Sequence, residues 1–151
     1  MAKNAADLFP DGIVFVDLAS LGDAVLVLST VSQTLGLRLT GDQPLFEVLQ
    51  ARLRQKRLLL LLDNFEHLLE AATEVALLVG SCSSLAVLAT SRAPLHVRGE
   101  RQYPVPPLEV PDPTHTPDVE AVAESPAARL FIDAPVKPPP PSSLPGRTLQ
   151  R

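Results

Sequence analysis

Residues 57–67 read RLLLLLDNFEH. The five leucines are apolar at every position, which is typical of a central strand in a parallel sheet with helices on both faces. The run stops at Asp63 and Asn64, and beyond them apolar residues recur at the spacing of a helix. This stretch therefore predicts a buried strand, a polar turn and a helix.

Similar patterns lie on both sides of this stretch. Further buried strands are predicted at residues 13–16 and 85–89, and helices at residues 23–35, 44–55 and 65–79. Gly36 and Gly80 are expected to end the first and last of these helices. Strands and helices that alternate in this way predict an α/β fold with a mostly parallel sheet and right-handed crossovers.

Proline is unevenly distributed. The chain has 151 residues and 16 prolines, and 14 of these prolines lie in residues 94–151. Because proline lacks a backbone donor, we expect only a short edge strand at residues 103–105 and a helix broken at Pro126 within residues 120–132. Residues 133–151, which include a run of four prolines, are predicted to be disordered.

Composition excludes several classes of protein. No apolar run approaches the ~20 residues of a membrane helix, and no apolar segment follows the N-terminal Lys3 as in a secretory signal. The single cysteine, Cys82, excludes an internal disulfide, so we expect a cytoplasmic protein without membrane contact. A net charge of −4 argues against direct nucleic-acid contact.

Polar side chains follow each predicted strand. In a parallel sheet the carboxyl ends of the strands lie at one edge, where ligands bind. The residues expected there, which we call the rim, are Asp17, Asp63, Asn64, Thr90, Ser91 and Arg92.

Asp63 and Arg92 each allow two interpretations. An apolar strand that ends in aspartate is typical of a Walker B motif, whose carboxylate holds a hydrated Mg²⁺, but such an aspartate can equally cap the next helix. An arginine at this edge could contact a γ-phosphate, or it could pair with a surface carboxylate. Glu66 and Glu70, four residues apart on one predicted helix face, fit a solvated first turn better than an acid/base pair with His67.

Four blocks of the sequence, at residues 9–19, 58–68, 87–95 and 98–108, resemble the NB-ARC-like ATPase module of bacterial STAND proteins. The resemblance covers residues 8–132 and is strongest to large LuxR-type and AfsR-like transcriptional regulators. It implies a P-loop (ASCE) NTPase three-layer sandwich with strand order 5-1-4-3-2. It also implies that Asp63 is the Walker B acid, that Arg92 senses the nucleotide, and that ATP and ADP, with Mg²⁺, switch the regulator.

The chain departs from that family in two ways. No Gly-x-x-x-x-Gly-Lys-Ser/Thr sequence occurs in it, so the loop that cradles the phosphates is missing together with its strand. Asn64 stands where many of these ATPases carry a glutamate, and Glu66 could replace that glutamate only if the turn returns it to the site. We therefore expect a fragment, with residues 1–132 as a partial ATPase domain, that neither binds nor hydrolyses ATP by itself.

The alternative function is a protein-interaction module. Without the P-loop strand, the strand at residues 85–89 would have an exposed edge, which could dock a partner. The polyproline segment at residues 138–141 offers a second docking element. The expected partners are other domains of the parent regulator or a second copy of the chain.

Overall fold

The structure is a computed structural model that describes residues 7–37, 43–110 and 119–133. The chain divides into two compact units, Met1–Gln102 and Tyr103–Arg151. The predicted boundary at residue 132 rests on the family resemblance, and it stays a prediction.

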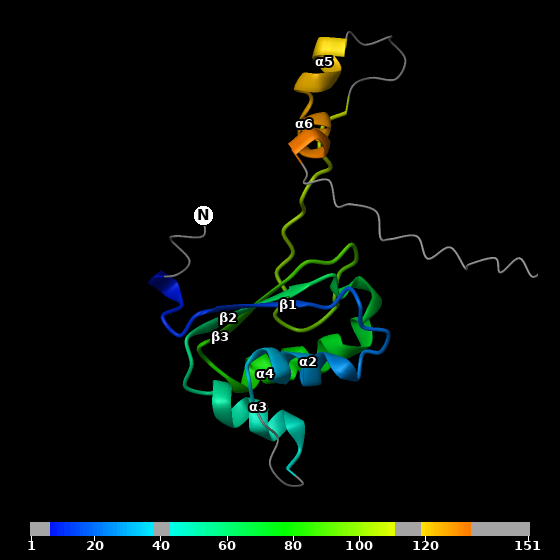
Figure 1. Cartoon of the computed structure of the whole chain (residues 1–151). Coiled ribbons are helices and arrows are strands. Elements are labelled where there is room, and N and C mark those ends of the chain that lie inside the picture. Colours follow the sequence, from blue (N-terminus) through cyan, green and yellow to red (C-terminus); the bar gives the residue numbers. More distant parts are fainter. Residues whose placement is uncertain (1–6, 38–42, 111–118, 134–151) are drawn as a thin grey trace, which may run out of the picture. The chain divides into compact units, whose positions relative to one another are not determined.

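The first unit contains a sheet of three parallel strands (Figure 1). Strand β1 (Ile13–Asp17) and strand β3 (Leu85–Ala89) flank the central strand β2 (Leu58–Asp63), which gives the order β1-β2-β3. This confirms an α/β fold with a parallel sheet. In the described residues β3 lies at an edge of the sheet, as expected of residues 85–89.

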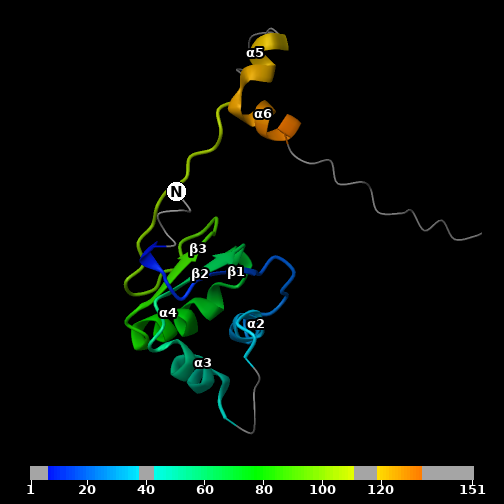
Figure 2. The same cartoon turned by 60° about the vertical axis from the view of Figure 1, so that its left-hand side comes forward.

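Three helices pack on one side of this sheet (Figures 1 and 2). They are α2 (Leu26–Thr34), α3 (Leu45–Leu53) and α4 (Ala72–Ser81). Helix α2 ends as predicted at Gly36, whose φ of 67° is favourable for glycine. There the backbone N–H of Leu37 donates to the carbonyl of Ser32 at 3.0 Å, which satisfies one of the last helical carbonyls.

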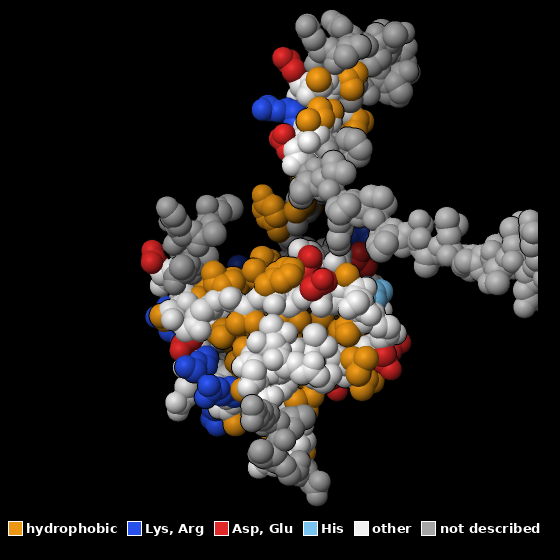
Figure 3. All heavy atoms as spheres, in the orientation of Figure 1, with side chains coloured by type: hydrophobic (Ala, Val, Ile, Leu, Met, Phe, Trp, Pro, Cys, Tyr) orange, Lys and Arg blue, Asp and Glu red, His pale blue; other side chains and the backbone are white. Residues whose placement is uncertain are grey.

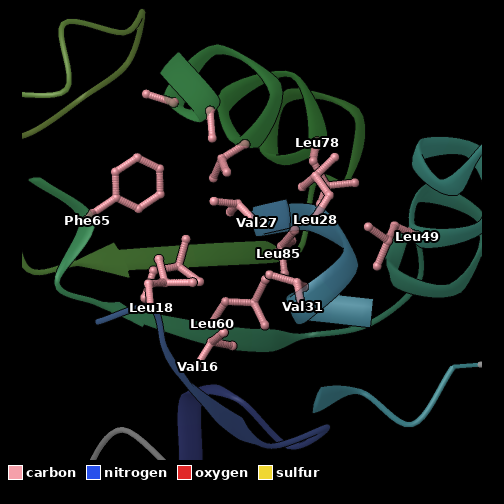
Figure 4. Packing of buried hydrophobic residues seen from close by; sticks show 14 of the residues in the cluster. Val16, Leu18, Val27, Leu28, Val31, Leu49, Leu60, Phe65, Leu78 and Leu85 are labelled. Atoms are coloured by element: carbon pink, nitrogen blue, oxygen red, sulfur yellow. The ribbon is translucent and has the colours of Figure 1, made fainter. Parts of the chain in front are cut away.

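The core lies between the helices and the inner face of the sheet (Figure 4). Alternate residues of β2 are buried there, namely Leu58, Leu60 and Leu62, and Val16 lies beside them on β1. Phe65, just after β2, has no exposed surface and packs in the same cluster. The inner face of the sheet and the helices above it therefore form one hydrophobic core.

The outer face of the sheet differs from the prediction that helices cover both faces. In the described residues of the first unit α2, α3 and α4 all lie on the inner face (Figure 1), so the three-layer arrangement is not found there. Phe15 and Leu88 on the outer face are each 57% exposed, and Ile13 is 38% exposed. The leucine run of β2 is apolar enough for both faces to be covered. Its neighbours on the outer face, Phe15 on β1 and Leu88 on β3, are nevertheless exposed.

The segment after β2 also differs from the prediction of one helix at residues 65–79. Two 3₁₀ turns, Phe65–His67 and Leu69–Ala71, come before α4. Asn64 adopts the left-handed conformation with φ 62°, which asparagine tolerates, and this redirects the chain at the end of β2. Helix α4 continues through Gly80 to Ser81, so Gly80 does not end it.

The second unit contains helices α5 (Val119–Glu124) and α6 (Pro126–Asp133). The predicted break at Pro126 is confirmed, because proline occupies the first turn of α6, where its missing N–H costs nothing. The Ser125 hydroxyl accepts the N–H of Ala128 at 3.2 Å and so caps α6. The predicted strand at residues 103–105 is wrong, since that segment forms no ladder.

Two further predictions concern the ends and the environment of the chain. Of the predicted disordered segment 133–151, Asp133 belongs to α6 and the remainder lies outside the described residues. Within the described ranges, every helix is too short or too polar to cross a lipid bilayer.

Candidate functional site

The rim lies at the carboxyl edge of the sheet because the three strands run in the same direction. Asp17 and Asp63 are register partners at the ends of β1 and β2. Neighbouring strands are about 4.8 Å apart, so the two carboxylates start from adjacent backbone positions. The Asp17 carboxylate accepts the backbone N–H of Ala19 at 2.9 Å, which fixes the turn after β1.

Thr90 connects β3 to the end of β2. Its hydroxyl donates to the Asp63 carboxylate and accepts the backbone N–H of Asn64 at 3.0 Å. The Thr90 carbonyl accepts the N–H of Phe65 at 2.9 Å. Two residues 27 positions apart in the chain, Asp63 and Thr90, are thus joined at the rim. The helix-cap interpretation of Asp63 is wrong, because its carboxylate accepts a hydrogen bond from the Thr90 hydroxyl and the first 3₁₀ turn has Asn64 at its N-cap without a side-chain bond.

Arg92 pairs with Glu66 across the same edge. The Arg92 Nε lies 2.8 Å from the Glu66 Oε1, so the interpretation that Arg92 pairs with a surface carboxylate is confirmed. The Arg92 side chain is 87% exposed and the Glu66 side chain 19% exposed. The turn after β2 therefore brings Glu66 to the rim, while most of the Arg92 side chain stays accessible to a ligand. Ser91 is engaged in its own turn, where its hydroxyl donates to the Ala93 carbonyl at 2.6 Å.

Glu66 has a perturbed carboxyl group. Its pKa lies below the usual 4.5, first because its own backbone N–H donates to the carboxylate and then because Arg92 does, while partial burial opposes the shift. A folded-state pKa below the unfolded value means that ionised Glu66 stabilises the fold above about pH 4.5. That contribution is lost as the pH falls through the lowered value.

We expect Glu66→Gln to weaken this pH dependence. In urea denaturation the wild-type midpoint should fall between about pH 5.5 and about pH 3.5, and the fall should be smaller for Glu66→Gln. The matched control is Glu70→Gln, an exposed glutamate in the next turn. Equal slopes for Glu66→Gln and wild type would contradict the role of the Glu66–Arg92 pair.

A shallow hollow lies beside the rim. Its lining residues are Gly22, Asp23, Ala24, Glu66, His67, Leu69 and Glu70. The His67 Nε2 lies 2.9 Å from the Leu21 carbonyl oxygen, so this side chain is bonded to the backbone of the neighbouring loop. Glu66 and Glu70 belong to separate 3₁₀ turns and not to one helix face as predicted.

Asp63 and Asp17 are the rim carboxylates that could hold a metal ion. No group of three His, Cys, Asp or Glu side chains in the described part of the chain is arranged to hold a metal. Mg²⁺ often binds through one or two carboxylates together with waters and substrate phosphates. Asp63, with Thr90 and Asp17 beside it, supplies oxygen ligands of this kind at the end of β2.

Sequence reasoning placed the rim residues at one edge but missed how they are joined. The hydroxyl bond from Thr90 to Asp63 and the ion pair from Arg92 to Glu66 each link residues about 26 positions apart. The sequence does indicate that such contacts can form. Strands β2 and β3 were predicted as parallel neighbours, and the residues of both pairs follow the carboxyl ends of these two strands.

Comparisons with known proteins find relatives in mycobacteria. A protein of Mycobacterium tuberculosis and one of Mycobacterium bovis, both provisionally named HTH-type transcriptional regulators, are each 38% identical to the chain over 103 residues, or 68% of it. An uncharacterized protein of M. tuberculosis is 35% identical over 95 residues, or 62% of the chain.

The chain spans only a small part of these relatives. It covers 12% of the length of the named regulators and 24% of the uncharacterized protein. No family model matches the chain, and no solved structure matches it.

Proposed function

We propose that the chain is part of a nucleotide-responsive module in a bacterial transcriptional regulator. In this proposal Asp63 holds a hydrated Mg²⁺ and Arg92 contacts a phosphate of ATP or ADP. The observation that carries the proposal is the convergence of Asp63, Thr90 and Arg92 at the carboxyl edge of a parallel sheet, where ligands bind in such folds. The regulator assignment draws on the names of the mycobacterial relatives and on the resemblance to STAND ATPases.

Each rim residue has a distinct role in this proposal. Thr90 holds the Asp63 carboxylate in place, so the charge that attracts Mg²⁺ is oriented before binding. Mg²⁺ is needed because Asp17, Asp63 and Glu66 would repel free ATP. Arg92, which has an exposed guanidinium, is the phosphate ligand.

Glu66 has two roles to consider in this proposal, one in holding Arg92 and one in hydrolysis. As the partner of Arg92 it holds the guanidinium close to the rim. It is also the catalytic candidate. It could orient an attacking water in place of the glutamate that many of these ATPases carry at the position of Asn64. We propose that binding, and not hydrolysis, is what these residues contribute, because Glu66 is engaged with Arg92.

The expectation that the chain does not bind ATP by itself applies to micromolar nucleotide, and at millimolar nucleotide we propose weak binding. The sequence contains no phosphate-cradling loop, and the backbone N–H groups and lysine of such a loop supply much of the affinity. We therefore expect a fluorescent ATP analogue to bind with a Kd on the order of 1 mM, and only with Mg²⁺.

An anisotropy titration with and without EDTA measures this affinity. The proposal predicts a Mg²⁺-dependent rise that stays unsaturated below about 1 mM nucleotide. A flat titration at about 5 mM MgATP analogue would contradict a nucleotide role for the rim. Micromolar binding would contradict the expectation that the chain is incompetent by itself.

A protein-interaction module is the second candidate. One observation favours it, because β3 is an edge strand of the described sheet and its outer backbone groups can accept another strand. The predicted docking element at residues 138–141 lies outside the described residues.

A further inference from the structure

The chain that leaves β3 forms a short strap on the first unit. The strap, residues 91–97, alternates between half-buried and exposed positions. Leu95 and Val97 are half-buried and pack against the hydrophobic core, whereas Arg92 and His96 are exposed. The segment that carries Arg92 is therefore held on the core by its apolar side chains.

Glu100 closes a loop with the far end of the strap. Its Oε1 accepts the backbone N–H of Leu95 at 3.0 Å, and its own backbone N–H donates to the Val97 carbonyl at 3.2 Å. Gly99 makes the turn between them with a φ of 87°, a conformation that favours glycine. The Glu100 side chain thus reaches back over five residues to the strap.

The backbone of the strap is shaped to receive this carboxylate. His96 has a φ of 55°, a left-handed conformation that such a residue keeps only where its surroundings support it. A left-handed residue in a segment lets successive N–H groups converge on one anion. The pKa of Glu100 lies below its usual 4.5, first because of the Leu95 N–H and then because of the N–H groups of Val97 and His96 and the His96 charge, while partial burial opposes the shift. Ionised Glu100 therefore stabilises the bend at His96.

Arg92 needs a fixed strap in order to pair with one particular carboxylate. Figure 3 shows several Asp and Glu side chains at the edge where the strands end. Asp17 and Asp63 lie at this edge, yet Arg92 pairs with Glu66 while its side chain stays 87% exposed. Exposed ion pairs are weak, and a weak pair selects poorly among neighbouring carboxylates. The position of Arg92 therefore depends on the backbone that carries it.

We propose that Glu100 is a positioning residue that fixes the strap and so sets the place of Arg92 at the rim. It acts through the backbone of the strap, from which the chain continues to the second unit at Tyr103. This role needs no nucleotide and goes beyond the function proposed above. Only the use that a phosphate makes of Arg92 rests on that function.

Nuclear magnetic resonance of the full chain, without nucleotide, tests the bond from Leu95 to Glu100. The Leu95 amide proton should move upfield as the pH falls from about 6 to about 3, because protonation makes the Glu100 carboxyl a weaker acceptor. Since the pKa of Glu100 is lowered, the midpoint should lie below 4.5. The charged groups beside Glu100, namely His96, Arg98 and Arg101, are retained in Glu100→Gln, so the movement should be absent from that variant. Equal titration of the Leu95 signal in both chains would overturn the proposal.

A second measurement at neutral pH follows Arg92 itself. In Glu100→Ala the Arg92 Nε–H signal should shift towards that of an unpaired arginine, and the Leu95 amide should exchange with solvent at least about tenfold faster. Glu100→Gln keeps an oxygen that can accept the Leu95 N–H, so it should restore part of both signals. The matched control is Glu109→Ala, which removes the same charge from an exposed position beyond the strap and should change neither signal.

Three outcomes would overturn the positioning role of Glu100. They are an unchanged Arg92 signal in Glu100→Ala, equal shifts in Glu100→Ala and Glu109→Ala, and a larger effect of Glu100→Gln than of Glu100→Ala. If Glu100→Ala fails to fold, Glu100→Gln decides the question, because its Arg92 signal must then shift while that of Glu109→Ala does not. Since nucleotide is absent throughout, these outcomes are distinct from a flat titration with MgATP analogue.

Discussion

Leu78→Ala is expected to lower the free energy of unfolding by about 3–5 kcal/mol. Leu78 is 1% exposed and projects from α4 into the core between that helix and the sheet (Figure 4). Truncation removes buried methyl groups and leaves a cavity that the surrounding core cannot fill. This loss is a large share of the about 5–15 kcal/mol by which domains of this size are stable.

The preceding residue provides a control on the same helix. Leu77 is 60% exposed, so Leu77→Ala should change the free energy of unfolding by no more than about 0.5 kcal/mol. Urea denaturation followed by circular dichroism measures both values. Similar losses for the two variants would contradict the assignment of the inner face of α4.

Asp63→Asn is expected to reduce Mg²⁺-dependent nucleotide binding at least about tenfold, or about 1.4 kcal/mol. The substitution removes the charge that attracts Mg²⁺ while keeping an oxygen that can accept the Thr90 hydroxyl. The fold should therefore stay intact, and the change in binding should report the loss of the carboxylate charge. The anisotropy titration with MgATP analogue measures the effect.

Glu74→Gln is the matched control for that variant. Glu74 is an exposed acidic residue in the first turn of α4, and its substitution removes the same charge from the unit. Binding should change by less than about twofold. If Glu74→Gln and Asp63→Asn weaken binding equally, the effect comes from overall charge and not from the rim.

The hydrophobic pattern of the sequence was most informative about the type and order of the strands and helices. Three strands and three helices were predicted in the correct order, because each strand is a short apolar run and each helix shows an apolar pattern at helical spacing. Pattern alone did not show that α2, α3 and α4 all lie on the same face of the sheet. Leu59 and Leu61 are as apolar as Leu60, and whether a helix covers them depends on chain elsewhere in the fold.

The candidate site was predicted as a set of positions and not as contacts. The rim follows from parallel strands that end in polar residues. The pairing of Arg92 with Glu66 depends on a local backbone change, since Asn64 turns left-handed and the two 3₁₀ turns replace the start of the predicted helix. Single-residue conformations of this kind are set by tertiary contacts, here the bonds from Thr90 to Asp63, Asn64 and Phe65.

The nucleotide role of the rim is tested most directly by nuclear magnetic resonance of the ¹⁵N-labelled chain. Its amide signals would be followed as MgATP is added to about 10 mM. The account predicts shifts confined to the rim, at the amides of Asn64, Thr90, Ser91 and Arg92, and their loss when EDTA removes Mg²⁺. Unchanged rim signals, or shifts concentrated where β2 begins near Arg57, would contradict it.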